Sequence, residues 1–317
     1  MRLCRTGQPT VEDLSVGSAP TPLPFNFCGL GRDQSDYASA RFVVLSVPYE
    51  GTVTYQKGTA AGPHAIIDAS RHLERFDEEL SFETSTLGIH TLEPLELPET
   101  PEQVVAEVER VTGQLLADKK LVCLLGGEHS VTVGAVRAAK KSFDGLSVLQ
   151  LDAHADLRDE FDGTSYSHAC VMKRCLEVAP VTQVGIRSLS KGEADLLKTE
   201  SNVTTYFAHD LRSAGCASFA RDILSTLTDE VYLTIDIDVF DPAYVPGTGT
   251  PEPGGLTWED VTGLIRSLAR EKQIVAFDVV EVMPIPGTAA SEFLAAKLAY
   301  RTMGYIAGAA NWLTSGK

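Results

Sequence analysis

The chain has 317 residues, of which 44% are hydrophobic and 22% charged, so it is long enough to bury a large core in one α/β domain. A formal net charge of −16 argues against a nucleic-acid groove or an anionic membrane surface, because both partners would be repelled, and favours cationic ligands. Six scattered cysteines without a C-x-x-C pair, no apolar leader and no run of roughly 18 apolar residues predict a reduced, cytoplasmic protein without a membrane span.

Residues 1 to about 40 contain Pro, Gly and Ser with little periodicity, so we predict an irregular N-terminal arm followed by one domain over 41–317. Short apolar runs typical of strands then alternate with helical stretches. The predicted strands are 42–47, 121–125, 147–151, 181–186, 203–207, 231–237 and 274–282, and the predicted helices are 106–116, 129–141, 168–178, 193–199, 218–226, 258–270 and 291–310. This alternation predicts a three-layer α/β/α sandwich with a mainly parallel central sheet, because the near-continuous apolar strands suit a sheet that is covered on both faces.

Polar side chains follow three of the predicted strands directly. In open parallel sheets the ligand crevice lies beyond the carboxyl ends of the strands, so these residues are the candidate site. Alternate residues of an extended chain point to the same side, so those within each segment are expected to converge. The three groups are Gly126-Gly127-Glu128-His129, then Asp152-Ala153-His154-Ala155-Asp156, and Asp236-Ile237-Asp238.

Four aspartates in this set would repel one another once buried, and the nearby sequence holds no matching lysines or arginines. Two divalent cations would supply +4 against −4, with one imidazole on each ion. Carboxylate and imidazole ligands without a thiolate suit Mn²⁺ and are compatible with Zn²⁺, Co²⁺ or Fe²⁺. A lone Asp-x-Asp is common in turns and caps, but three such groups each ending a buried strand favour a metal site. We predict structural roles for the remaining histidines, His64, His72, His90 and His209.

Four segments together resemble the ureohydrolase family of arginases and agmatinases: GGEHS, DAHADLRD, IDIDVFDPAYVPGTGTPEPGG and the late DVVEV. With the early loop PYEGTVTYQKGTAAGP, the resemblance spans about residues 42 to 304. It implies the family's parallel-sheet fold, two Mn²⁺ per subunit and hydrolysis of a guanidinium group to urea. It also implies a homo-oligomer, a trimer or a hexamer.

The resemblance implies a role for each matching residue. His129 and Asp156 would bind one metal ion, His154 and Asp238 the other, while Asp152 and Asp236 would bridge both. His168 matches a histidine that shuttles protons near the leaving amine, Glu281 a carboxylate that pairs with the guanidinium, and Thr250 a residue lining the substrate slot. Glu128 stands where many relatives have an aspartate, so we expect it to affect support of the site more than the number of ligands.

The chemistry requires an activated water, because a guanidinium carbon is a poor electrophile. Two cations sharing one water lower its pKa from ~15.7 towards 7. Asp156 is expected to take the first proton, and His168 to exchange protons with the leaving amine, a role suited to a side chain titrating near pH 6.5.

The segment 157–163 is acidic and would repel a substrate carboxylate, which favours agmatine, cleaved to putrescine and urea. Arg158 could pair with the carboxylates of guanidinobutyrate and guanidinopropionate, so these two compounds are alternative substrates, as is arginine. A metal-dependent deacylase of acylated polyamines and a catalytically silent metal- or polyamine-binding protein are the alternatives from other classes.

Overall fold

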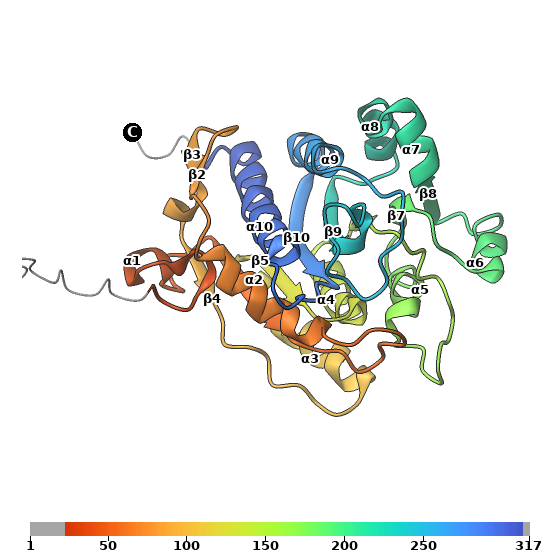
Figure 1. The fold of residues 1–317 in the computed structure, drawn as a ribbon, viewed down its shortest axis with the longest axis horizontal. Helices are drawn as coiled ribbons and strands as arrows, with labels where there is room; N and C mark the ends of the chain where they lie inside the picture. Colours follow the sequence, from red (N-terminus) through yellow and green to blue (C-terminus); the bar gives the residue numbers. More distant parts are fainter. Residues whose placement is uncertain (1–22, 313–317) are drawn as a thin grey trace, which may run out of the picture.

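Eight parallel strands form the central sheet of the computed structural model, which describes residues 23–312 (Figure 1). From edge to edge the strands run in the order β4, β1, β5, β10, β9, β6, β7, β8, and all neighbouring pairs are parallel. Their bounds are β1 Phe42–Val47, β4 Ile89–Thr91, β5 Leu121–Gly126, β6 Ser147–Leu151, β7 Val181–Ile186, β8 Val203–Phe207, β9 Glu230–Asp236 and β10 Gln273–Val280. A separate antiparallel pair consists of β2 (Phe76–Asp77) and β3 (Phe82–Glu83). The carboxyl ends of the eight strands therefore share one edge of the molecule.

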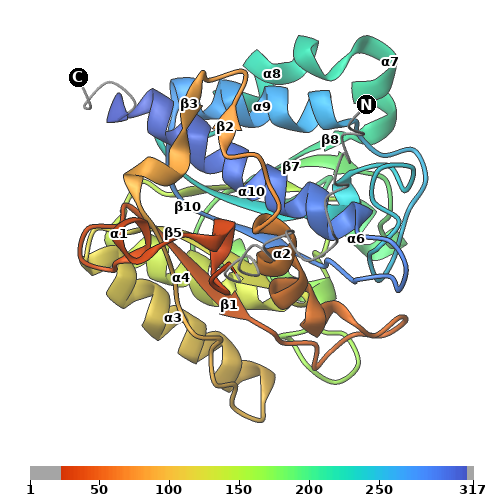
Figure 2. The same cartoon turned by 60° about the vertical axis from the view of Figure 1, so that its left-hand side comes forward.

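Helices cover both faces of this sheet, as Figure 2 shows for α9 and α10 on one side and α3 and α4 on the other. Side chains of α2, α7, α8, α9 and α10 pack on the first face, and those of α3, α4 and α5 on the second. The bounds are α1 Arg32–Ser35, α2 Gly62–Ser70, α3 Pro101–Ala117, α4 Thr132–Ser142, α5 Val171–Cys175, α6 Lys191–Leu196, α7 Ala208–Ala214, α8 Cys216–Ser225, α9 Trp258–Glu271 and α10 Ala290–Ala309. The predicted three-layer sandwich is confirmed.

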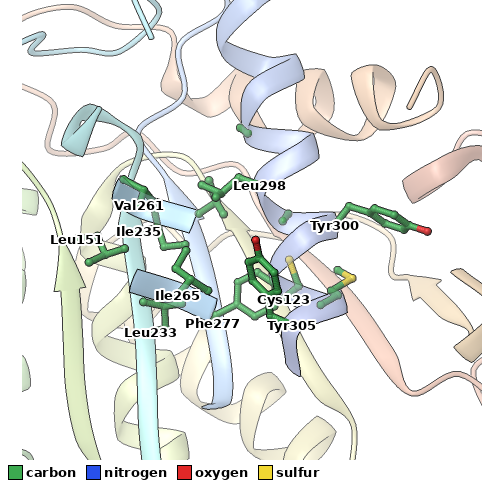
Figure 3. Packing of buried hydrophobic residues seen from close by; sticks show 14 of the residues in the cluster. Cys123, Leu151, Leu233, Ile235, Val261, Ile265, Phe277, Leu298, Tyr300 and Tyr305 are labelled. Carbon is green, nitrogen blue, oxygen red and sulfur yellow. The ribbon is translucent and has the colours of Figure 1, made fainter. Parts of the chain in front are cut away.

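The apolar runs of the strands are continuous because both faces are buried. In β5, Cys123 and Leu125 belong to the core on the α9–α10 side, whereas Val122 and Leu124 belong to the core on the α3–α4 side. Figure 3 shows Phe277 of β10 among labelled side chains from β9, α9 and α10. Each such apolar side chain contributes about 1.5–3 kcal/mol when it is fully buried, so the two cores hold the sheet rigid beneath its carboxyl edge.

Most predicted elements are present, with shifts at their ends. The first five predicted strands match within a residue, whereas β10 ends at Val280 and the chain after β9 forms a 3₁₀ turn, Ile237–Val239. The predicted helix 168–178 is a 3₁₀ turn, His168–Cys170, followed by the short α5. The sequence did not predict the short elements α1, β2, β3, β4 and α7. It also did not predict α2, whose Gly62-Pro63 start resembles a loop but suits the first turn of a helix.

Part of the predicted arm lies against the domain. Residues 27–29 form a 3₁₀ turn, α1 follows, and Phe27 and Leu30 are buried in the core. Residues 1–22 lie outside the described residues, so the boundary near residue 40 stays a prediction. Within residues 23–312 no helix is long and apolar enough to cross a membrane. The five cysteines in that range are buried and unpaired, and Cys4 lies outside it.

Gly127 connects three of the loops at the carboxyl edge of the sheet. Its N–H donates to the carbonyl of Val47 (2.9 Å), and its own carbonyl accepts from the N–H of Glu281 (2.8 Å). A Cβ at position 127 would lie 2.0 Å from the carbonyl oxygen of Tyr49, a backbone atom that cannot move aside alone. Glycine at this position therefore allows the loops after β1, β5 and β10 to meet.

We predict that Gly127→Ala lowers the free energy of unfolding by at least about 1–3 kcal/mol, because the new methyl group forces the loops apart. The matched control is Gly263→Ala in α9, where a Cβ has no atom within 4 Å. This control should gain about 0.5–1 kcal/mol from the lower entropy of the unfolded chain. Chemical denaturation of both variants is the measurement, and equal stabilities would contradict the predicted clash.

Candidate active site and metal centre

His129 lies among three aspartates at the centre of the carboxyl edge. It begins the 3₁₀ turn after β5, and its Nδ1 lies 3.1 Å from Asp152 Oδ2. The distances from the same nitrogen to Asp156 Oδ2 and Asp236 Oδ2 are both 3.4 Å. These aspartates follow β6 and β9, which are neighbours in the sheet, so the parallel topology brings distant segments of the chain together.

His154 forms a second group on the far side of Asp152. Its Nδ1 lies 2.9 Å from Asp238 Oδ2 and 3.7 Å from Asp152 Oδ1. Two trios, His129–Asp152–Asp156 and Asp152–His154–Asp238, each bring their ligand atoms within 4.8 Å of one another. Asp152 belongs to both trios. Five of the six predicted ligands therefore form two groups that are each able to hold a metal ion. Asp236 lies beside the first group, 3.4 Å from His129 Nδ1, and its predicted bridging of both ions stays a prediction.

The surroundings of His129 fit a metal ligand. The hydroxyl of Thr234 donates to Asp278 Oδ1 (2.6 Å), so its single hydrogen is used there and its oxygen accepts from Nε2–H of His129 (2.9 Å). The lone pair of Nδ1 then faces the carboxylates, and Nδ1 is buried without a hydrogen-bond partner. An imidazole ligand is commonly held in this way, with its other nitrogen donating to a fixed partner.

The charges of the cluster are unbalanced without added cations. Burial, together with repulsion from Asp238 and Asp152, raises the pKa of Asp236 well above its usual value. Burial and the charge of Asp152 raise the pKa of Asp156 to about 6. Burial lowers the pKa of His129, but in the absence of cations the surrounding aspartates outweigh this and raise that pKa well above its usual value, so a proton on Nδ1 takes the place that a cation would occupy. The cluster thus favours positive charge, and divalent cations would supply it.

Hydrogen bonds from two backbone N–H groups and one side chain hold the carboxylates in position. Asp152 Oδ1 accepts from the N–H of His154 (2.6 Å), and its Oδ2 accepts from Gln150 Nε2 (2.7 Å). Asp238 Oδ1 accepts from the N–H of Ala153 (3.0 Å), while its Oδ2 lies near His154. The β6 and β9 loops therefore orient these carboxylates before any ion is bound.

A cavity of 290 Å³ opens beside the cluster. His154, Asp156 and Asp236 line it, together with the three residues predicted from the resemblance, His168, Thr250 and Glu281. The loop after β1 adds Val53, Thr54, Tyr55 and Gln56, which the sequence reading did not single out. Candidate ligands and candidate substrate-binding groups therefore share one cavity.

Glu281 is held in a constrained conformation at this cavity. Its φ is +63°, in the left-handed region, which costs a non-glycine residue about 1–3 kcal/mol. Its Oε1 accepts from the N–H of His129 (2.7 Å), and its own N–H binds the carbonyl of Gly127. Burial and the charge of Glu128 raise the pKa of Glu281 to about 8. A cationic group in the cavity would relieve that effect, so the carboxyl is suited to a positively charged partner.

The carboxylates of segment 157–163 do not line the cavity. Arg158 and Phe161 do, with the guanidinium carbon of Arg158 4.8 Å from the centre of the Phe161 ring. Asp159 instead pairs with Arg174 (2.6 Å) at the surface. The charge of Asp162 nevertheless acts on His168 in the cavity wall, so the expected repulsion of a substrate carboxylate by this segment stays a prediction.

The remaining histidines lie elsewhere. His90 Nδ1 contacts the carbonyl of Ser35 (2.8 Å), the ring of His64 lies on Phe25, and His209 is exposed. Neither these three nor His72 lines the cavity. Their structural roles stay predictions.

Arg187 is a site residue that the sequence reading missed. It follows β7, and its guanidinium donates to backbone carbonyls of the loop after β9, including those of Asp238 (2.7 Å) and Glu252 (2.7 Å). Further bonds reach the carbonyls of Gly185, Val239 and Phe240. Arg187 thereby fixes the loop that carries Asp238 and Thr250. Its position directly after an apolar strand is the signal that would have identified it.

A model of the arginase family matches residues 40–304. The chain belongs to the arginase family. The predicted ureohydrolase membership is thus confirmed, and with it the prediction of a hydrolytic enzyme.

Similar proteins and solved structures match this chain over most of its length. A protein of Synechocystis sp. named N(1)-aminopropylagmatine ureohydrolase is 41% identical over 86% of this chain and 90% of its own. An agmatinase of Pyrococcus horikoshii is 31% identical over 86% of this chain and 94% of its own. The crystal structure of agmatine ureohydrolase of Thermoplasma volcanium matches with a TM-score of 0.82 at 32% identity, covering 91% of this chain and 96% of that one.

We predict that Arg187→Met lowers the free energy of unfolding by at least about 2 kcal/mol, because several buried carbonyls lose a charged donor. It should also expose the loop after β9 to proteases. Arg266→Met is the matched control, since Arg266 makes an exposed ion pair with Glu79 (2.5 Å) and should cost under about 1 kcal/mol. Denaturation and limited proteolysis are the measurements, and a loss no larger than in the control would count against this role of Arg187.

Proposed function

We propose that this enzyme hydrolyses the guanidinium group of an agmatine-type amine and releases urea. The observation that carries the proposal is the convergence of six candidate metal ligands on a cavity that Glu281 also lines. Two trios of imidazole and carboxylate groups support two divalent cations, with Mn²⁺ as the first choice for this ligand set. When bound, such cations supply the positive charge that makes water a nucleophile near neutral pH.

The side chains that line the cavity would bind the substrate and transfer protons. Glu281 would pair with the cationic guanidinium, an interaction that two oxygens make well. Asp156 would accept a proton from the attacking water, and Thr250 would line the substrate slot. His168 would carry a proton to the leaving amine, which is a poor leaving group until it is protonated.

The surroundings of His168 change the expected form of that transfer. Burial lowers the pKa of His168 to about 4, so the ring is neutral at pH 7 rather than titrating near pH 6.5. A proton taken up by such a ring is held weakly and is released readily to an amine. His168 therefore fits a transient carrier better than a stored acid.

Relatives support an extended cationic substrate. Four relatives named N(1)-aminopropylagmatine ureohydrolase are 36% to 41% identical to this chain, and three named agmatinase are 30% to 32% identical. We therefore place N(1)-aminopropylagmatine first and agmatine second, with urea and the corresponding tri- or diamine as products. Arg158 on the cavity wall is the observation that favours the second candidate function, hydrolysis of guanidinobutyrate or guanidinopropionate.

Urea release from five substrates in the presence of Mn²⁺ tests this order. The panel is N(1)-aminopropylagmatine, agmatine, arginine, guanidinobutyrate and guanidinopropionate. We expect the largest kcat/KM for N(1)-aminopropylagmatine and little effect of Arg158→Ala on the two amines. A kcat/KM for arginine, guanidinobutyrate or guanidinopropionate above that for both amines would reject the proposed substrate order. The second candidate would be supported if the guanidino acids had the larger kcat/KM and lost it in Arg158→Ala.

The metal content of variants tests whether Asp152 contributes to both metal positions. We predict that the native chain binds two Mn²⁺, that His154→Ala loses one, and that Asp152→Asn weakens both because Asp152 belongs to both trios. Asp159→Asn is the control, since Asp159 pairs with Arg174 at the surface. Elemental analysis after equilibration is the measurement. Equal metal content in Asp152→Asn and the control would refute the shared role.

His168→Ala tests the proton carrier. We expect a loss of about 10²–10⁴-fold in kcat with both metal ions retained, because His168 acts on protons rather than on ions. The measurements are urea release and elemental analysis of the same preparation. Loss of metal in this variant would overturn the assignment.

A further inference from the structure

Glu128 joins the loop after β1 to the loop after β5. Its carboxylate is fully buried and accepts three hydrogen bonds. The N–H of Thr52 lies 2.7 Å from Oε2, while the hydroxyls of Thr52 and Ser130 lie 2.6 Å and 2.5 Å from Oε1. Glu128 thus holds Thr52 by both its backbone and its side chain.

The hydroxyl of Thr52 also contacts His168 twice. Its oxygen accepts from the backbone N–H of His168 (3.0 Å) and lies 3.3 Å from ring Nδ1. A hydroxyl has one hydrogen, and the contact with the Glu128 carboxylate uses it, because a carboxylate only accepts. The Thr52 oxygen has no proton left for Nδ1, so the contact is a hydrogen bond only when Nδ1 carries the hydrogen.

We propose that Glu128 and Thr52 are positioning residues that set the tautomer of His168, with the proton on Nδ1 and the lone pair on Nε2. The functional meaning rests on the proposed role of His168 in hydrolysis, whereas the tautomer is a property of the folded chain. His168 lines the cavity and its Nδ1 is in contact with Thr52, so Nε2 is the ring nitrogen left to accept a proton from that cavity. The ring would begin each cycle as a base and become an acid after one transfer.

The neighbours of His168 offer one weaker alternative. Ser167 Oγ lies 3.5 Å from Nδ1, at the outer limit of a hydrogen bond, and also accepts from the N–H of Ala169 (3.4 Å). A proton donated by Ser167 would favour the opposite tautomer. The shorter contact with Thr52 and its anchoring by Glu128 favour the Nδ1–H form.

The tautomer can be read from the ring nitrogens by NMR. The probe is the chain with ¹⁵N-labelled histidine, loaded with diamagnetic Zn²⁺, and the signal of His168 is the one missing in His168→Gln. We expect a protonated Nδ1 and an unprotonated Nε2 in the native chain and in Thr52→Ser, which keeps the hydroxyl. Ser167→Ala should match the native chain, whereas Thr52→Val should populate the other tautomer.

Two results would overturn the tautomer assignment: an unprotonated Nδ1 in the native chain, or a spectrum of Thr52→Val that equals the native one. Because this readout needs no substrate, it decides the assignment even if the chain releases no urea from any guanidino compound. Failure of the proposed function and failure of the inference are therefore distinguishable.

Kinetics test the consequence for turnover. Thr52→Val should lower kcat about 10- to 100-fold with unchanged metal content and a similar KM, because general acid–base transfer is impaired but binding is not. Thr52→Ser should restore most of the native kcat. A native kcat in Thr52→Val together with a switched tautomer would overturn the inference that the tautomer serves turnover.

Discussion

Mutual repulsion among four buried aspartates is the constraint on which the rest of the structure depends. Asp236 ends β9, Asp238 follows it, and Asp152 and Asp156 follow β6. Because β6 and β9 are neighbouring parallel strands, their carboxyl ends bring the four carboxylates together. Both apolar cores hold that sheet in place, so the carboxylates stay together at a cost in free energy. Imidazoles between them offset part of that cost, and bound cations would offset the remainder.

A carboxylate, a threonine hydroxyl and an imidazole occur in series twice around this cluster. Asp278 and Thr234 turn the lone pair of His129 towards the aspartates, and the corresponding pair on the other side is Glu128 and Thr52. In both series the hydroxyl donates its one hydrogen to the carboxylate. The same arrangement thus directs Nδ1 of His129 towards the aspartates, where it could bind a cation, and, by our proposal, leaves Nε2 of His168 unprotonated.

Sequence reasoning located the candidate ligands because they depend on local pattern and sheet topology alone. An apolar run followed by polar residues can be recognised in the sequence. A parallel sheet then brings the ends of such runs together at one edge. Thr52 and Arg187 escaped because their partners lie far away in the chain, Glu128 in one case and the loop after β9 in the other. The effect of the acidic segment after Asp156 stays a prediction, because composition does not say which side chains of a loop face a cavity.

The bonds of Arg187 are all to main-chain carbonyls, which every residue type carries. The Asp241 carboxylate adds bonds from the N–H groups of Ala243, Gly254 and Gly255, so the path of the loop after β9 depends on few side chains. Exposed positions of this loop, such as Ala243 and Thr250, can therefore vary while Asp238, which precedes them, keeps its place. Residues that would contact a substrate are in this way separated from those that would hold a metal ion.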